Sequence, residues 1–123
     1  MSKVVNGGKN AIRDALLTGK DIQIELAEVG TDGNATSVTD TQLGNKLEDY
    51  ATTNVDASTG EARFEFTIPE TDAAVDGQTL REVGLKIDPA GEDTLFCRIR
   101  FADTPKAEGD AFDFEITATT ENA

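Results

Sequence analysis

The feature of this sequence that most constrains its fold is a strict alternation of apolar and polar residues, which is clearest at residues 61–68. In the segment EARFEFTI every second side chain is apolar, and those between are charged or Thr. Successive side chains of a β-strand point to opposite faces, so this period of two predicts a strand with one face in a core and one in water. The apolar set is Ala62, Phe64, Phe66 and Ile68.

The same alternation recurs along the chain and predicts about six strands, including one before the turn at 58–60. The strands on either side of that turn are expected to form a hairpin, and those flanking the DPAGED turn at 88–93 a second one. The other alternating apolar sets are Ile22, Ile24 and Leu26, then Val83, Leu85 and Ile87, then Leu95, Cys97, Ile99 and Phe101, and finally Phe112, Phe114 and Ile116.

One segment has helical spacing instead. NGGKNAIRDALLTG places Ile12, Ala15 and Leu16 on one face, with Leu17 beside them, and predicts a short amphipathic helix that ends at Gly19. A single such helix cannot form a core, so it is expected to cover an open edge or end of the sheets.

Strands that follow one another without intervening helices favour an antiparallel sheet folded as a two-layer sandwich. We therefore predict an all-β antiparallel β-sandwich of about six strands with one short N-terminal helix. The 123 residues fit a single domain, with the helix and arm at 1–19 and the sandwich at 20–120.

The charge balance limits the partners. The 24 acidic and 11 basic residues leave a formal charge of −13, which repels nucleic acid and anionic lipid surfaces. The sequence shows neither a long apolar run nor a basic-then-apolar leader, so we expect no membrane contact and synthesis in the cytoplasm. The acidic, lysine-poor composition is also typical of proteins from extreme halophiles.

The sequence offers little for catalysis. It contains no His and only one Cys, which removes the commonest general base and the usual zinc ligands. Cys97 has no base to activate it and is expected to be a small buried hydrophobe. Pairs of Asp and Glu are assigned to the solvated acidic surface. We expect no enzyme activity, no catalytic residue and no cofactor.

Two turns place oxygen ligands around a glycine, as calcium-binding loops do. They are GTDGN at 30–34, with Asp32, and DPAGED at 88–93, with Asp88. Neither reaches the distal glutamate of a calcium hand, and the needs of tight turns explain both. We expect no metal site, although a cation at either loop stays an open alternative.

The arginines on the strands have two interpretations. Arg63, Arg81, Arg98 and Arg100 alternate with apolar residues, which favours exposed cross-strand ion pairs of under about 1 kcal/mol each. The alternative is that they dock on the acidic surface of a neighbouring subunit.

The segment VTDTQLGNKL at 38–47 interrupts the alternation. Leu43 and Leu47 are spaced to form one apolar stripe, Asp40 could cap the following turn, and Gly44 permits close approach. We expect a short helical or looped crossover that carries the chain across the sandwich and presses Leu43 into the end of the core. The alternative is an exposed loop.

Four segments in order resemble a known family. They are NGGKNAIRDALLTG, ELAEVGTDGNATSVTDTQLGNKL, a Phe-rich strand and LREVGLKIDPAGEDTLFCRIRF. Together they resemble small tail fibre, tail-collar and baseplate proteins of tailed viruses, whose segments run VGTG, DTxLGxE, xxExGLF and LxARxxF. The chain departs from that pattern at Lys46, where the family has Glu, and at Lys86, where it has an aromatic residue.

The resemblance implies a non-enzymatic virion structural protein at the tail tip, baseplate or fibre attachment, made in the host cytoplasm and present in the virion. Its partners would be other virion proteins and further copies of itself, in threes or sixes. One alternative is a capsid decoration or vertex turret protein, in fives. A carbohydrate-binding module is more distant, because sugar platforms use exposed Trp or Tyr and the chain has only Tyr50.

Overall fold

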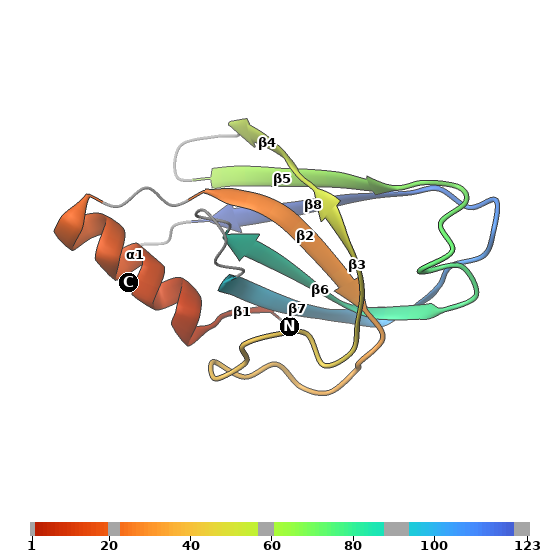
Figure 1. The fold of residues 1–123 in the computed structure, drawn as a ribbon, viewed down its shortest axis with the longest axis horizontal. Helices are drawn as coiled ribbons and strands as arrows, with labels where there is room; N and C mark the ends of the chain where they lie inside the picture. The colour runs from red at the N-terminus through yellow and green to blue at the C-terminus, as the bar shows by residue number, and fades with distance from the viewer. Residues whose placement is uncertain (1, 20–22, 57–60, 88–93, 120–123) are drawn as a thin grey trace.

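Two antiparallel sheets pack face to face in the computed structural model, which describes residues 2–19, 23–56, 61–87 and 94–119 (Figure 1). Sheet A has the strand order β1-β7-β6-β2-β3, and sheet B the order β4-β5-β8. The strands of sheet A are β1 (Ser2–Val4), β2 (Ile24–Gly30), β3 (Lys46–Ala51), β6 (Thr79–Ile87) and β7 (Thr94–Pro105). Those of sheet B are β4 (Thr53–Asp56), β5 (Glu61–Ile68) and β8 (Phe112–Thr119).

The predicted all-β sandwich is confirmed, but the described residues form eight strands rather than six. One added strand is β1, which pairs with β7. The other arises because the strand expected before residue 58 is divided: the chain leaves sheet A after Ala51 and enters sheet B at Thr53. The hairpins β4–β5 and β6–β7 form as predicted, although their turns at 57–60 and 88–93 lie outside the described residues.

The core lies between the sheets and follows the predicted alternation in β5 and β6. Phe66 and Ile68 of β5 are buried, and the rings of Phe66 and Phe114 stack with centroids 4.8 Å apart. Burial of such apolar surface is the main source of stability in a sandwich of this kind. The buried members of the core are Ile24, Ala27, Val29, Phe66, Ile68, Val75, Leu80, Val83, Leu85, Ile87 and Cys97.

Irregularities in two strands overturn part of the predicted pattern. The register of β2 with β6 shifts between Ile24 and Leu26, so Leu26 lies opposite Lys86, on the outer face of sheet A. A second shift, between β6 and β7, sets Leu95 opposite Lys86 as well. An extra residue reverses the facing of the side chains beyond it. The prediction that Leu95 shares a face with Cys97 is therefore wrong. Ile22 lies outside the described residues.

Helix α1 (Asn6–Thr18) is present as predicted and ends at Gly19, which has φ of 70°. It lies at one end of the sandwich, beside the start of β7 (Figure 1). Ala11 packs against the core, whereas Leu16 and Leu17 are exposed. The prediction that the apolar stripe of this helix covers the sandwich is therefore wrong for its C-terminal half.

Residues 31–45 form a long loop without a helix between β2 and β3. These two strands are hydrogen-bonded neighbours in sheet A, so the loop does not cross from one sheet to the other, and the predicted crossover is wrong. The loop folds back over the outer face of sheet A, the face turned away from sheet B (Figure 1). Leu43 is buried there, as predicted, but against the outer face rather than the end of the core.

Candidate functional site

The carboxylate of Glu82 is the centre of a polar cluster between this loop and the outer face of sheet A. Glu82 lies on β6 and its side chain is fully buried. One oxygen, Oε2, accepts the backbone N–H groups of Asp32 and Asn45, and the other, Oε1, accepts that of Gly44, each at 2.9 Å. A buried carboxylate needs such donors, because desolvation of an unpartnered charge is very costly. Glu82 thus joins the two ends of the loop to β6.

Arg98 on β7 is the charged partner of Glu82. Its Nε donates to Glu82 Oε1 at 2.9 Å, and its side chain is only 3% exposed. The two terminal nitrogens donate to the backbone oxygens of Ala35 and Asp32, at 3.3 and 3.2 Å. The guanidinium fork suits this task because it presents several donors in a fixed plane. Arg98 therefore binds the middle of the loop as well as neutralising Glu82.

The prediction that Arg98 is an exposed cross-strand pair is wrong, because the loop covers it. The prediction holds for Arg81, whose Nε lies 3.0 Å from an oxygen of Asp103 on β7. The closer partner of Arg63 is Glu65 of its own strand, at 3.1 Å, and its cross-strand contact is with Glu115 of β8, at 4.0 Å. Arg100 is exposed and donates to the carbonyl of Gly33 at 3.2 Å.

Two acidic residues of the loop also face Arg98. Asp40 Oδ2 lies 3.5 Å from Arg98 Nη1 and accepts the N–H of Ser37, three residues earlier. The prediction that Asp40 caps the following turn is therefore wrong. Asp32 Oδ1 accepts the N–H of Asn34, and its Oδ2 lies 3.8 Å from Arg98 Nη2. Asp32, considered above as a cation ligand, thus has an arginine of the same chain beside its carboxylate.

Gly44 within the loop and Gly84 beneath it on β6 have no room for a side chain. A Cβ on Gly44 would collide with the carboxylate of Asp32. A Cβ on Gly84 would lie 3.0 Å from Leu43 and 2.8 Å from Leu95. Leu43 and Leu95 therefore pack over Gly84 and form an apolar seal beside the polar cluster. Gly44 does permit a close approach, but to Asp32 of the same loop and not to the end of the core as predicted.

A second buried ion pair lies farther along the same face. Glu28 on β2 and Lys86 on β6 are each 5% exposed, with Nζ 3.5 Å from Glu28 Oε2. Lys46 Nζ lies 3.7 Å from the same oxygen and 2.7 Å from Asp49 Oδ2. Burial raises the pKa of Glu28 despite the two lysines. Sequence periodicity could not identify either pair, because both faces of β6 are buried.

Two other side chains that could take part in chemistry, Lys106 and Cys97, are buried inside the fold. Lys106 is buried, and its Nζ donates to Asp76 Oδ1 at 2.6 Å and to the carbonyls of Glu70 and Ala107. Cys97 lies in the core, where desolvation raises its pKa to about 11 and favours the unreactive thiol. Among the residues that the structure describes, no three His, Cys, Asp or Glu side chains gather as a metal site. The loop containing Asp88 lies outside that part.

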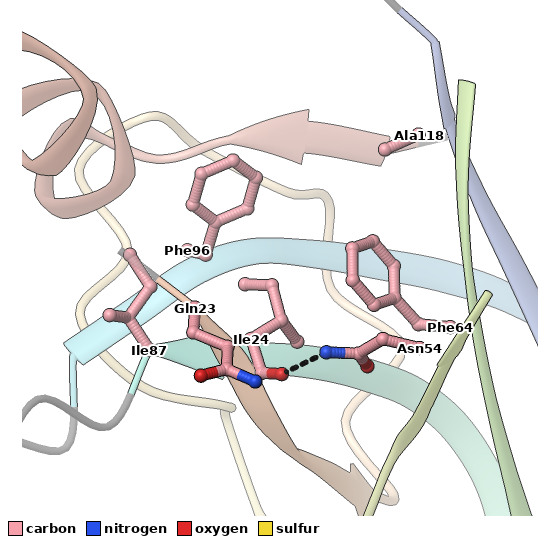
Figure 2. Close-up of a pocket in the computed structure, with 7 residues that line it drawn as sticks. All are labelled: Gln23, Ile24, Asn54, Phe64, Ile87, Phe96 and Ala118. Atoms are coloured by element: carbon pink, nitrogen blue, oxygen red, sulfur yellow. Dashed lines mark hydrogen bonds between the residues drawn. The ribbon is translucent and has the colours of Figure 1, made fainter. Parts of the chain in front are cut away.

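An apolar pocket opens between the sheets at the end of the sandwich next to α1 (Figure 2). It has a volume of about 300 Å³. Phe96 of sheet A and Phe64 of sheet B line its two walls, and Asn54 Nδ2 donates to the carbonyl of Ile24 at 2.8 Å (Figure 2). The remaining lining residues are Gln23, Ile87 and Ala118, so among the described residues no charged side chain lines the pocket.

Comparison of the chain with known protein families, with curated proteins and with solved structures gave no significant match. In the described part of the chain no helix is long and apolar enough to cross a membrane.

Proposed function

We propose that this protein is a non-enzymatic structural component of a tailed virus particle, at the tail tip, baseplate or fibre attachment, where it binds other virion proteins. The observation that carries the proposal is the meeting of four short motifs at Glu82. The motifs VGTD, DTQLGN, LREVGL and LFCRIRF, which lie in two of the segments that resemble tail proteins, supply in turn the N–H group of Asp32, those of Gly44 and Asn45, Glu82 itself, and the guanidinium of Arg98.

This convergence gives the order and spacing of the motifs a physical reason. A glutamate in the LREVGL segment requires amide donors from the VGTD and DTQLGN segments and a cation from the LFCRIRF segment. A loop held in this way presents a fixed surface, and fixed surfaces lose little entropy when a partner binds. The cluster therefore supports an assembly role, in which the loop is held rigidly in place.

The open sheets support repeated copies. Sheet A ends at β1 and β3, and sheet B ends at β4 and β8, so four edges lack a strand partner within the described chain. Edge strands invite association, and closed rings use that tendency without uncontrolled growth. We propose three or six copies in the particle, as the resemblance to tail proteins implies, and a halophilic host, as the acidic composition implies.

Labelling of purified particles of the encoding virus tests the proposal. Gold-conjugated antibody raised against the purified chain is expected to mark the tail end in electron micrographs, and quantitative mass spectrometry is expected to count copies in a multiple of three. An antibody against the major capsid protein serves as the positional control. Label at five-fold vertices would show a capsid turret instead, and absence of the chain from the particles would reject a virion role altogether.

A further inference from the structure

Helix α1 is fixed at its first turn and lies in solvent at its last. The N–H of Val5 donates to the carbonyl of Phe96 at 3.1 Å, and that of Asn6 donates to the carbonyl of Val38 at 2.7 Å. A Cβ on Gly8 would collide with the backbone of Phe96, so the helix backbone touches β7 directly. The orientation of α1 is therefore set by backbone contacts and not by its leucines.

The leucines of α1 are left without cover. Leu16 is 81% exposed, Leu17 is 76% exposed and Ile12 is 38% exposed. They are the large exposed hydrophobic residues of the described chain, and they lie together on the C-terminal half of one helix. Adjacent apolar side chains in water are typical of an interaction surface.

The N-terminal segment and the rest of the chain carry opposite net charges, and this difference indicates the kind of partner that the segment attracts. Residues 1–20 hold four of the 11 basic residues and one of the 24 acidic ones, a formal charge of +3. Residues 21–123 therefore carry a formal charge of −16. The segment with the exposed leucines is thus attracted to a strongly acidic protein, and the sandwich of a second copy is such a protein.

The pocket in Figure 2 is a matching receptor on that second copy. It is apolar, and its walls include Phe64, Phe96 and Ile87. In Figure 2 the helix lies beside the residues that line the pocket, so the pocket and α1 are at the same end of the sandwich. Two copies that meet at these ends can therefore make the same contact twice, and a contact repeated about a two-fold axis closes on itself.

We propose that two copies of this chain associate end to end, with Leu16 and Leu17 of each helix inserted into the apolar pocket of the other copy. The contact covers both exposed surfaces and places each helix, which carries Lys9, Arg13 and Asp14, against an acidic sandwich. It requires nothing from a virus particle, so its failure would leave the proposed function untouched.

Sedimentation of the purified full-length chain tests the association. We expect a dimer whose dissociation constant is micromolar or lower, and a monomer for the double variant Leu16→Ser, Leu17→Ser at the same concentrations. Asn10→Ser, an exposed polar position on the same helix, is the matched control and should remain dimeric. Circular dichroism checks that each variant is folded. A monomeric unmodified chain, or a double variant that still forms dimers, would overturn the proposal.

Disulfide trapping tests which surfaces meet. A tagged Leu17→Cys copy is mixed with an untagged Ala118→Cys copy, so that the mixed disulfide has its own mobility on a non-reducing gel. The native Cys97 is buried and stays out of the exchange. We expect the mixed species to form readily, and far less of it when the second copy carries Thr71→Cys. Thr71 is exposed and follows Ile68, the end of β5 farther from Ala118. Equal trapping with Thr71→Cys would reject the pocket as the receptor.

Discussion

At the residue scale the loop depends on one fully buried carboxylate. Glu82 has four donors around its two oxygens, three from the loop and one from Arg98. A buried ion pair adds little stability over an apolar pair of the same size. Removal of one partner, however, leaves an uncompensated buried charge and strongly destabilises the fold.

Glu82→Gln is therefore expected to lower the free energy of unfolding by about 3–5 kcal/mol, because it leaves the guanidinium of Arg98 buried without its nearest charge. Urea unfolding measures the change. The matched control is Asp103→Asn, which breaks the exposed pair with Arg81 and should cost less than about 1 kcal/mol. Equal losses in the two variants would contradict the assignment of Glu82 as the central support of the loop.

The raised pKa of Glu28 predicts how the stability of the fold depends on pH. Burial raises the pKa of Glu28 above its ordinary value of 4.5. Just above pH 4.5 the folded protein therefore holds a proton that the unfolded chain has released, and stability from this group falls as pH rises through that window. Glu28→Gln cannot ionise. Urea unfolding at a series of pH values should show the native chain losing stability relative to this variant as pH rises from 4.5, and a gain would contradict it.

At the element scale, alternation predicted the strands that bury one face. It predicted β5 and the inner residues of β6, because each of these strands keeps an unbroken period of two. It misplaced Leu26 and Leu95, because one extra residue in a strand reverses every later side chain and leaves no mark in composition. It also missed the burial of Arg98, since the cover comes from a loop more than fifty residues away in sequence.

In the 31–45 loop the buried side chain of Leu43 is expected to contribute strongly to stability. Leu43→Asp should lower the melting temperature sharply, because the side chain is 2% exposed and packs beside Gly84, where a carboxylate has no donor. Thermal unfolding followed by circular dichroism measures the change. Gln42→Asp, the exposed neighbour, adds the same charge and is the control, with little change expected. An unchanged melting curve for Leu43→Asp would mean that the loop contributes little to stability.

At the scale of the whole molecule the net charge is strongly negative. The chain carries a formal charge of −13, and folding withdraws Lys86, Arg98 and Lys106 from the surface into buried pairs. Repulsion among the exposed carboxylates therefore opposes the compact state and is relieved when ions screen it.

Salt should accordingly stabilise the protein. We expect the melting temperature to rise between about 0.1 and 2 M potassium chloride, because the screening length falls from about 10 Å at 0.1 M to less than about 3 Å above 1 M. Melting curves at several concentrations measure this. A parallel series in sucrose, which is uncharged, separates screening from general exclusion effects. A flat or falling melting temperature would argue against adaptation to a halophilic host.

The strand order also sets when the chain can fold during its synthesis. β2 takes its place between β3 and β6, and β5 pairs along its whole length with β8, from Glu61 opposite Thr119 to Ile68 opposite Phe112. Until the ribosome has released β8, the inward rings of β5 have no neighbour on that side, and the aromatic stack of Phe66 on Phe114 cannot exist. Pairings between distant segments form slowly and leave apolar surface open to aggregation meanwhile. The nascent chain must therefore stay soluble while unfolded, and its high density of carboxylates keeps neighbouring unfinished chains apart.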